Sequence, residues 1–334
     1  MPVSAPSSLC STCRKQKNRY SHGISYTIYV VDYDYSLLPG DHRRGLSRIT
    51  VAVFATLVVY IASFLLHARL MTDISQWLLL LGVAGLAIYL MVESSLNKAA
   101  IRRFIETYAV AECSEAELWE NIPPCFSWLN DNPELLDAQV RDGFVFPLGD
   151  GVECILFDFI YTLSSNGKRG RRYAYAIAVI REKQVFPHLF LDAKQNGSSR
   201  AYEGSQRLSL EGDFDEYFNL YVPDNESTNA LVVFTPDIMA VLVDAGRPYD
   251  VELIGDSVIV VASGSQYERY RLKALFTFLS AFDMELNEKP VEWSDMDLAG
   301  ILTHTLARRK YYDSKLVLWL IIALAAVALL WVTV

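Results

Sequence analysis

Residues 153–163 read ECILFDFIYTL and residues 172–181 read RYAYAIAVIR, and this pair of stretches decides the fold class. Both are rich in aromatic and β-branched residues, which are typical of β-strands. The segment 165–170, SNGKRG, lies between them and has the composition of a turn. The two stretches therefore predict a β-hairpin at the centre of the chain.

Further strands and helices follow this hairpin, without the regular alternation of strand and helix that builds parallel sheets. Thr235 is suited to cap a helix, Pro236 suits its first turn, and Gly246 is suited to end it. Strands are predicted over 188–192, 207–210, 218–222 and 230–234, a second hairpin over 251–262 around Gly255-Asp256, and helices over 267–282 and 297–312. The pattern predicts an α+β domain with a mostly antiparallel sheet.

Three long apolar segments flank this domain, at 49–68, 74–92 and 316–334. None of them contains Asp, Glu, Lys or Arg, and about 20 helical residues are enough to cross the hydrocarbon core of a bilayer. Because lipid offers the backbone no hydrogen-bond partner, each segment is predicted to be a transmembrane helix. The first two are joined by a short loop and are predicted to form a transmembrane hairpin.

The orientation of these spans follows from the Lys and Arg residues near their ends, which are enriched on the cytoplasmic side. Basic residues lie before the first span, after the second and before the third: Arg43, Arg44, Arg48, Lys98, Arg102, Arg103, Arg308, Arg309, Lys310 and Lys315. All three groups predict a multi-pass protein of the plasma (inner) membrane. Its N-terminus and soluble domain are expected in the cytoplasm and its C-terminus outside.

The chain thus divides into a series of predicted segments. These are a polar, basic tail over 1–48 with a strand at 25–35 and no structure before it, a transmembrane hairpin over 49–93, a juxtamembrane helical segment over 94–142, a soluble α+β domain over 143–285, a helical connector over 286–315 and a third span over 316–334. Residues 104–307 contain 15 Lys and Arg against 33 Asp and Glu, a net charge of −18. Such an acidic domain is not expected to bind nucleic acid, which requires a basic surface.

Four short stretches carry a resemblance to a known family. They are LEGDFDEYF at 210–218, YVP at 221–223, FTPDIM at 234–239 and YDVEL at 249–253, and the stretches FDF at 157–159 and FPHLFLD at 186–192 fit the same pattern. Together they resemble bacterial membrane proteins built around the domain of unknown function numbered 3137. The resemblance covers about residues 143–265 and implies a pair of spans followed by a strand-rich soluble domain. It implies no activity.

One histidine is a candidate for catalysis. His188 and Asp192 could act as a general base and the residue that orients it, with Asp213 or Asp215 close by. No Ser or Cys lies in a nucleophile context such as G-x-S-x-G. The other interpretation, which the sequence favours, is a structural histidine at a strand edge and an aspartate in a turn.

Two patterns have the composition of metal sites. Cys10-x-x-Cys13 supplies half of the four ligands of a structural zinc site, and its alternative is a pair of free thiols in the tail. The acidic stretch 211–216 lacks the order of ligands of a calcium-binding loop, and this favours a solvated loop before a strand. No zinc, calcium or other cofactor is therefore predicted.

Lys168, Arg169, Arg171 and Arg172 form the one basic cluster of the acidic domain. The cluster could contact anionic lipid, a nucleotide or an acidic partner, or it could be a solvated hairpin tip. The sequence contains no G-x-x-x-x-G-K-[ST] motif, which argues against nucleotide hydrolysis.

These features predict a non-enzymatic binding or scaffold module that is tethered to the membrane. Its expected partners are the lipid bilayer and a membrane or cytosolic protein, and homo-oligomers remain open because the tyrosine-rich strand at 25–35 could pair with another chain. The alternative is a membrane-anchored hydrolase that uses His188 with nearby aspartates.

Overall fold

The structure of the protein is a computed structural model. The structure describes residues 13–17, 27–31, 33–35, 84–85, 88, 91–92, 95–96, 98–149, 151–165, 168–197, 202–210, 212–264, 271–288, 291, 293–294, 298, 300–301 and 303–307. The chain divides into two compact units. Unit 1 comprises Met1–Glu112, Phe144–Gly151 and Gln266–Ser280, and unit 2 comprises Cys113–Gly143, Val152–Ser265 and Ala281–Val334.

Unit 1 contains short strands from the N-terminal part of the chain. They are β1 (Cys13–Lys17), β2 (Thr27–Val31) and β3 (Ala111–Glu112), and β1 pairs with β2 while β2 and β3 pair with the end of β4 (Leu135–Gly149). β2 lies inside the strand predicted over 25–35. β1 lies where no structure was predicted, because its polar residues carry no strand signal and only the pairing with β2 makes it a strand.

An aromatic cluster forms the described core of unit 1. The ring of Tyr33 lies 4.9 Å from that of Phe276 and 5.1 Å from that of Tyr108, and the Tyr33 hydroxyl donates to the carbonyl oxygen of Pro147. The Asp34 N–H donates to the Tyr108 hydroxyl at 2.7 Å. These contacts fix the residues after β2 against the helical residues 98–108.

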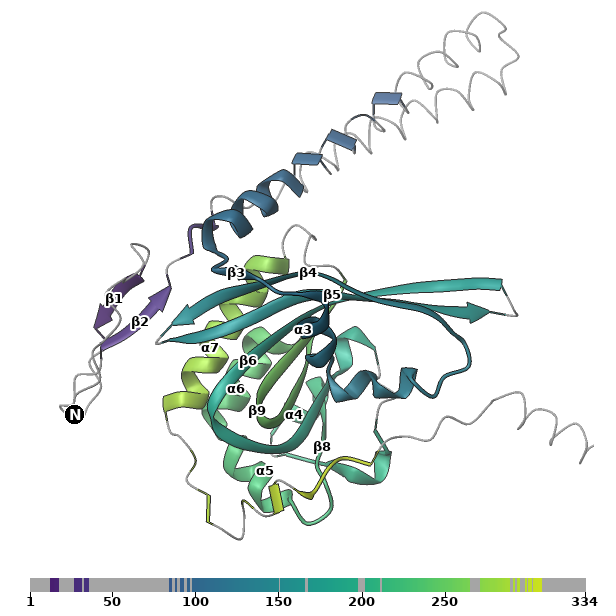
Figure 1. The fold of residues 1–334 in the computed structure, drawn as a ribbon. Helices are drawn as coiled ribbons and strands as arrows, with labels where there is room; N and C mark the ends of the chain where they lie inside the picture. The colour runs from purple at the N-terminus through teal and green to yellow at the C-terminus, as the bar shows by residue number, and fades with distance from the viewer. Residues whose placement is uncertain are drawn as a thin grey trace, which may run out of the picture. The chain divides into compact units, whose positions relative to one another are not determined.

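The sheet of unit 2 is antiparallel and is built around one long strand. Its strands are β4, β5 (Val152–Ser165), β6 (Lys168–Ala193), β7 (Arg207–Leu208), β8 (Phe218–Tyr221) and β9 (Tyr249–Ser263). They follow the order β4-β5-β6-β8-β7, and β9 pairs with β6 (Figure 1). Phe190 of β6 pairs with both Tyr221 and Glu252, so β8 and β9 lie on opposite sides of β6. Helices accompany this sheet, which confirms the predicted α+β class.

The predicted second hairpin around Gly255 is wrong. β9 continues through this position and stays paired with β6, and 172–181 and 188–192 are likewise one strand rather than two. Between the pairs Arg181↔Ser257 and Leu189↔Leu253, β6 advances by eight residues and β9 by four, so β6 carries a large bulge. Gly255 has a φ of +56°, a conformation that other residues rarely adopt. It pairs with Phe186 inside the irregular region and is not part of a turn between two strands.

The helices of unit 2 are short. They are α3 (Glu115–Glu120), α4 (Phe214–Tyr217), α5 (Ser227–Val233) and α6 (Pro236–Val241), with the 3-10 helices η2 (Pro124–Leu129), η3 (Lys194–Asn196) and η4 (Gly204–Gln206) and the π-helix η5 (Leu242–Gly246). α7 (Arg271–Glu288) has residues in both units. Thr235 caps α6 as predicted, its side chain accepting from the Ile238 N–H at 3.4 Å.

Two predicted boundaries differ from the structure. The strand predicted over 230–234 is the helix α5, in which Ala230 and Val233 are buried and Leu231 and Val232 are exposed. A short apolar run fits either structure, and here the three-residue spacing of the buried side chains is helical. The helical segment predicted to reach 142 ends earlier, because β4 begins at Leu135.

A continuous apolar core lies within unit 2. The ring of Phe126 in η2 lies 5.0 Å from the rings of Phe159 in β5 and Tyr175 in β6. Phe190, Ile259 and Leu306 belong to the same buried cluster. The core therefore connects η2 with β5, β6 and β9 and with the residues near 306.

The predicted spans 49–68 and 316–334 lie outside the described residues, as does most of 74–92. In the part of the chain that the structure describes, no single helix has the length and apolar character to cross a membrane. One pair of helices, Ser227–Val233 and Pro236–Gly246, which meet at a bend of 71°, meets the criteria of length and composition together.

Candidate functional site

His188 lies inside unit 2, 4% exposed, in a buried hydrogen-bond network. Its Nε2 lies 2.8 Å from Oε1 of Glu252 and 3.1 Å from the hydroxyl of Tyr202, and its Nδ1 lies 3.2 Å from the backbone N–H of Leu306. A backbone N–H only donates, so Nδ1 must carry a lone pair and the ring proton must be on Nε2. The network therefore holds a neutral imidazole that donates to Glu252.

Glu252, on β9, is the centre of this network and is completely buried. Its Oε1 accepts from the Tyr202 hydroxyl as well as from His188, and its Oε2 accepts from the backbone N–H of Cys125 at 3.1 Å. A buried carboxylate is tolerated when donors surround it, and three donors do so here. The arrangement joins η2, β6 and β9 with the chain near 202.

The Cys125 thiol, next to this carboxylate, is not an activated nucleophile. Burial raises its pKa well above the ordinary value, and the charges of Glu252 and Asp250 raise it further. Only the thiolate reacts readily, and this environment disfavours it. Among the described residues of this network, Cys125 is therefore not placed to act as a nucleophile.

The aspartates predicted to assist His188 lie elsewhere. Asp192 is completely buried and accepts from the side-chain amide of Asn219 at 3.0 Å. Asp213 is exposed and immediately precedes α4. Neither is among the described partners of His188. His188 and Asp192 are four residues apart on one strand, which separates them by about 13 Å at the usual rise per residue.

The acidic stretch that includes Asp213 has a structural role through its neighbour Asp215. One carboxylate oxygen of Asp215 accepts from the Ser209 hydroxyl at 2.5 Å, and the other accepts from the Leu210 N–H at 3.3 Å. Among the described residues, no group of three or more His, Cys, Asp or Glu side chains is placed to hold a metal ion. The two cysteines considered as zinc ligands cannot be placed, because Cys10 and the side chain of Cys13 lie outside the described residues.

Asp250 is a second unusual carboxyl group, two residues before Glu252 on β9. It accepts from the Ala193 N–H at 2.8 Å and from the side-chain amide of Asn196 at 3.0 Å. Burial of the carboxyl raises the pKa of Asp250 to about 7, the two hydrogen bonds oppose this shift, and the charges of Asp192 and Glu252 add to it. Asp250 therefore changes charge near neutral pH.

The last described residues of the chain, 303–307, contact the hydrogen-bond network of His188 and are here named the C-terminal strap. Ala307 and Gln206 exchange two hydrogen bonds, of 2.8 and 2.9 Å, and Glu203 donates to the Ala307 carbonyl at 3.2 Å. Nδ1 of His304 lies 2.6 Å from a carboxylate oxygen of Glu226. With the contact of Leu306 to His188, these bonds fix the strap to unit 2.

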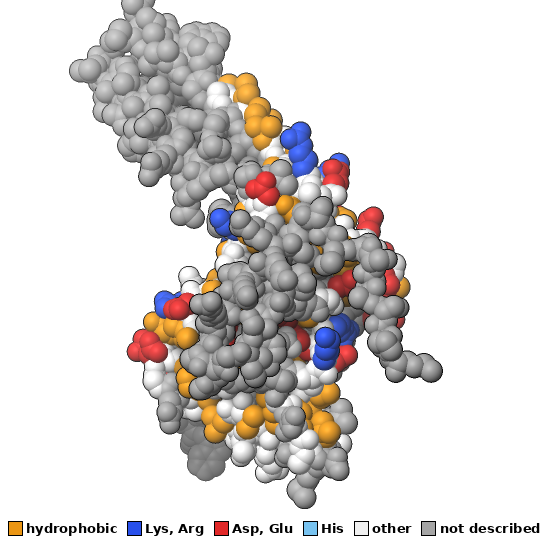
Figure 2. All heavy atoms as spheres, turned by 90° about the vertical axis from the view of Figure 1, so that its left-hand side faces the viewer, with side chains coloured by type: hydrophobic (Ala, Val, Ile, Leu, Met, Phe, Trp, Pro, Cys, Tyr) orange, Lys and Arg blue, Asp and Glu red, His pale blue; other side chains and the backbone are white. Residues whose placement is uncertain are grey.

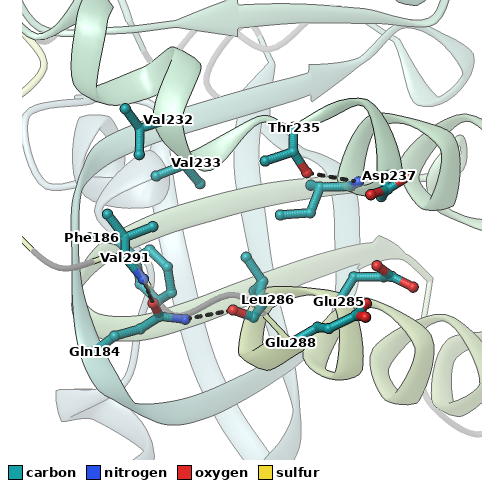
Figure 3. Close-up of a pocket in the computed structure, with 11 residues that line it drawn as sticks. Gln184, Phe186, Val232, Val233, Thr235, Asp237, Glu285, Leu286, Glu288 and Val291 are labelled. Atoms are coloured by element: carbon teal, nitrogen blue, oxygen red, sulfur yellow. Dashed lines mark hydrogen bonds between the residues drawn. The ribbon is translucent and has the colours of Figure 1, made fainter. Parts of the chain in front are cut away.

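One pocket of unit 2 is not lined by His188. Figure 3 shows it between β6, α5, α6 and the end of α7, with the side chain of Gln184 donating to the Leu286 carbonyl at its edge. Its cavity volume is about 20 Å³, which is room for a single water rather than for an organic substrate. The pocket is therefore not a substrate site in this conformation.

Sequence reasoning missed Glu252 and Tyr202, the two partners that define the environment of His188. A glutamate between Val251 and Leu253 in an apolar strand is a signal for a buried carboxylate that needs partners. Its partner was not recognisable, because the contact depends on the register in which β9 pairs with β6.

Comparisons of the chain with models of protein families, with characterised proteins and with solved structures found no match. The resemblance to the family with the domain of unknown function numbered 3137 therefore stays a prediction.

Proposed function

We propose that the chain is an integral membrane protein of a bacterial plasma membrane, and that its acidic α+β domain is a non-enzymatic binding or scaffold module on the cytoplasmic side. The predicted spans 49–68 and 74–92 precede this domain, and the predicted span 316–334 follows it. Anchors on both sides keep the domain close to the bilayer and raise its effective concentration for membrane partners.

The observation that carries the membrane anchoring is the exposure of apolar side chains on the described helical residues 84–85, 88, 91–92 and 95–96. Figure 2 shows hydrophobic side chains on the surface of this helix, and the exposed fractions are 61% for Ile88, 70% for Met91, 52% for Val92 and 64% for Leu96. Water disfavours such a concentration of apolar surface, whereas lipid accommodates it. The exposed basic residues Arg102 and Arg103 follow, as expected for the cytoplasmic end of a span.

The C-terminal strap supports a mechanical connection between the domain and the third predicted span. The strap ends nine residues before position 316 and is bound to unit 2 by the contacts of His304, Leu306 and Ala307. A segment held by several hydrogen bonds transmits a displacement of the span to the buried network. This favours a scaffold whose core is coupled to its membrane anchor.

A binding role, rather than catalysis, is supported by the chemistry of the described site. His188 uses both ring nitrogens in structural hydrogen bonds, the neighbouring thiol is disfavoured as a thiolate, and the described cavity is the size of one water. General acid–base catalysis requires a side chain that reaches a substrate proton. The surface of the domain is therefore the expected place of function.

Proximity labelling from the full chain in its native membrane tests this proposal. A labelling enzyme fused to the N-terminus is expected to mark a reproducible set of membrane-associated proteins. A control chain that keeps the three spans but carries an unrelated domain in place of 104–307 should lose this set. Hydrolytic turnover by the purified full chain that disappears in His188→Ala would refute the binding role and support the hydrolase instead.

A further inference from the structure

The tip of the β5–β6 hairpin is rich in basic residues. The basic tip, residues 168–172, begins where Ser165 pairs with Lys168, and it holds four of the 15 basic residues found in 104–307. The side chains of Arg171 and Arg172 are exposed and form no ion pair with any residue that the structure describes. The segment 104–307 has a net charge of −18, so exposed Arg side chains without an ion pair are unusual in it. Such side chains are suited to bind an anionic partner.

Aromatic rings support this tip on one face of the hairpin. The Arg171 guanidinium lies 5.2 Å from the centre of the Tyr173 ring, and Tyr173 stacks on Tyr161 at 5.0 Å. Trp128 meets Tyr161 edge-on at 6.2 Å. Tyr161 is buried while Tyr173 and Trp128 are half-buried, so the rings lead from the core to the surface.

An exposed aliphatic residue lies beside this hairpin. The Ser164 N–H donates to the carbonyl oxygen of Glu134, which places the start of β4 next to the end of β5. Leu136, in this part of β4, is 53% exposed. Tyrosine, tryptophan and leucine next to lysine and arginine form the composition that proteins use at the boundary between headgroups and acyl chains.

We infer that the basic tip docks on anionic phospholipid headgroups of the membrane that carries the protein. The inference rests on the proposed function, because the anchors keep the hairpin within reach of a bilayer. Phosphate groups match guanidinium and ammonium groups in charge and in hydrogen bonding. Each Lys or Arg near an anionic surface strengthens binding about fivefold at moderate salt, so the tip and the anchors together hold the domain in one orientation.

Hydrogen exchange of the full chain tests this inference. The protein is placed in nanodiscs of phosphatidylcholine alone and in nanodiscs that also contain phosphatidylglycerol. Slower exchange at backbone amides of residues 161–173 is expected only in the anionic discs. The double variant Arg171→Glu, Arg172→Glu should lose this protection, because it replaces attraction to the headgroups by repulsion.

A charge-matched control separates this contact from a general effect of net charge. Lys183→Glu with Arg207→Glu changes the net charge by the same amount at two exposed positions outside the tip, and protection should persist. Equal exchange in both kinds of disc, or loss of protection in the control, overturns the inference and leaves an acidic protein as the partner of the tip.

Extraction of the full chain from membranes distinguishes a failure of the headgroup contact from a failure of membrane anchoring. A chain that is released from membranes by alkaline carbonate contradicts the proposed anchoring, whatever the tip does. Cosedimentation of the full chain with phosphatidylglycerol and phosphatidylcholine vesicles then decides the inference. Arg171→Glu with Arg172→Glu is expected to weaken binding to the anionic vesicles at least about 25-fold, at about fivefold for each lost charge. An unchanged affinity overturns it.

Discussion

Asp250 gives the domain a stability that depends on pH. The pKa of its carboxyl is about 7 in the folded protein against 3.8 for an ordinary aspartate, chiefly because of burial. Between pH 4 and pH 7 the folded state therefore binds more protons than the unfolded state, and stability falls as the pH rises through this window. The residue keeps some exposed surface, so we expect a loss on the order of 2 kcal/mol rather than the full value of the shift.

The variant Asp250→Asn is expected to remove most of this dependence. Its amide oxygen can still accept from the Ala193 N–H, and it carries no charge at any pH. Thermal unfolding of the full chain in detergent, from pH 5 to pH 8, measures the effect. The wild-type midpoint should fall with rising pH while that of the variant stays flat. A parallel fall in both proteins would show that another group is responsible.

Two substitutions of His188 test its hydrogen bonds to Glu252 and to Leu306 separately. Glutamine places its side-chain nitrogen near the position of Nε2 and can still donate to Glu252, whereas asparagine places an oxygen near Nδ1 and can still accept from Leu306. We expect His188→Gln to release the strap and speed exchange of the Leu306 amide about fivefold, the effect of losing a hydrogen bond of about 1 kcal/mol.

The matched variant His188→Asn should protect the Leu306 amide and lower the global stability instead. It removes one of the donors to Glu252, at a cost of about 1–3 kcal/mol for a buried group. Hydrogen exchange at Leu306 and denaturant unfolding of the same samples separate the two effects. If asparagine released the strap and glutamine did not, the assignment of the ring proton to Nε2 would be wrong.

At the scale of elements, the bulge between β6 and β9 depends on Gly255. Its φ of +56° is costly for any residue with a Cβ atom, although no atom lies within 4 Å of the position where a Cβ would be. Gly255→Ala should therefore destabilise the domain by about 1–2 kcal/mol through backbone strain alone. Gly204→Ala, where the Cβ also has open space and φ is not positive, should be nearly neutral. Equal denaturation midpoints for the two variants would show that the positive φ of Gly255 does not strain an alanine at this position.

How far the sequence predicts these elements depends on whether the signal is local. The hairpin of β5 and β6 and the Thr235 cap were predicted, because propensity and capping act over a few residues. α5 was mistaken for a strand, since an apolar run of five residues fits both structures. The bulge was read as a turn because Gly255-Asp256 is a good turn sequence, and only the pairing with β6 overrides it.

The same limit applies to the candidate site. His188 was recognised from its residue type, but its partners were sought at Asp192 and at Asp213 or Asp215. The true partners are separated from it by 64 residues for Glu252 and 118 for Leu306. Such contacts follow from register and from the path of the strap, and a single sequence contains no local signal for either.

For the whole molecule, the buried network lies close in the chain to a predicted anchor. The strap, whose Leu306 donates to His188, is followed in the sequence by Arg308, Arg309 and Lys310 and then by the predicted third span. Exposed apolar side chains lie at the end of the predicted second span. The domain is therefore connected to its predicted anchors at both ends, and at the C-terminal end through its core.

The predicted topology can be tested by cysteine labelling. Thr72→Cys in the first loop and Val334→Cys at the end of the chain should react with a membrane-impermeant maleimide in intact spheroplasts, because both are predicted to lie outside. Lys183→Cys, in the exposed part of β6, should react only after permeabilisation. The native cysteines are all on the predicted cytoplasmic side, so the wild-type chain is the background control. Labelling of position 183 in intact spheroplasts would place the domain outside the cell. The basic tip would then face the outer leaflet and could not contact the cytoplasmic headgroups as proposed.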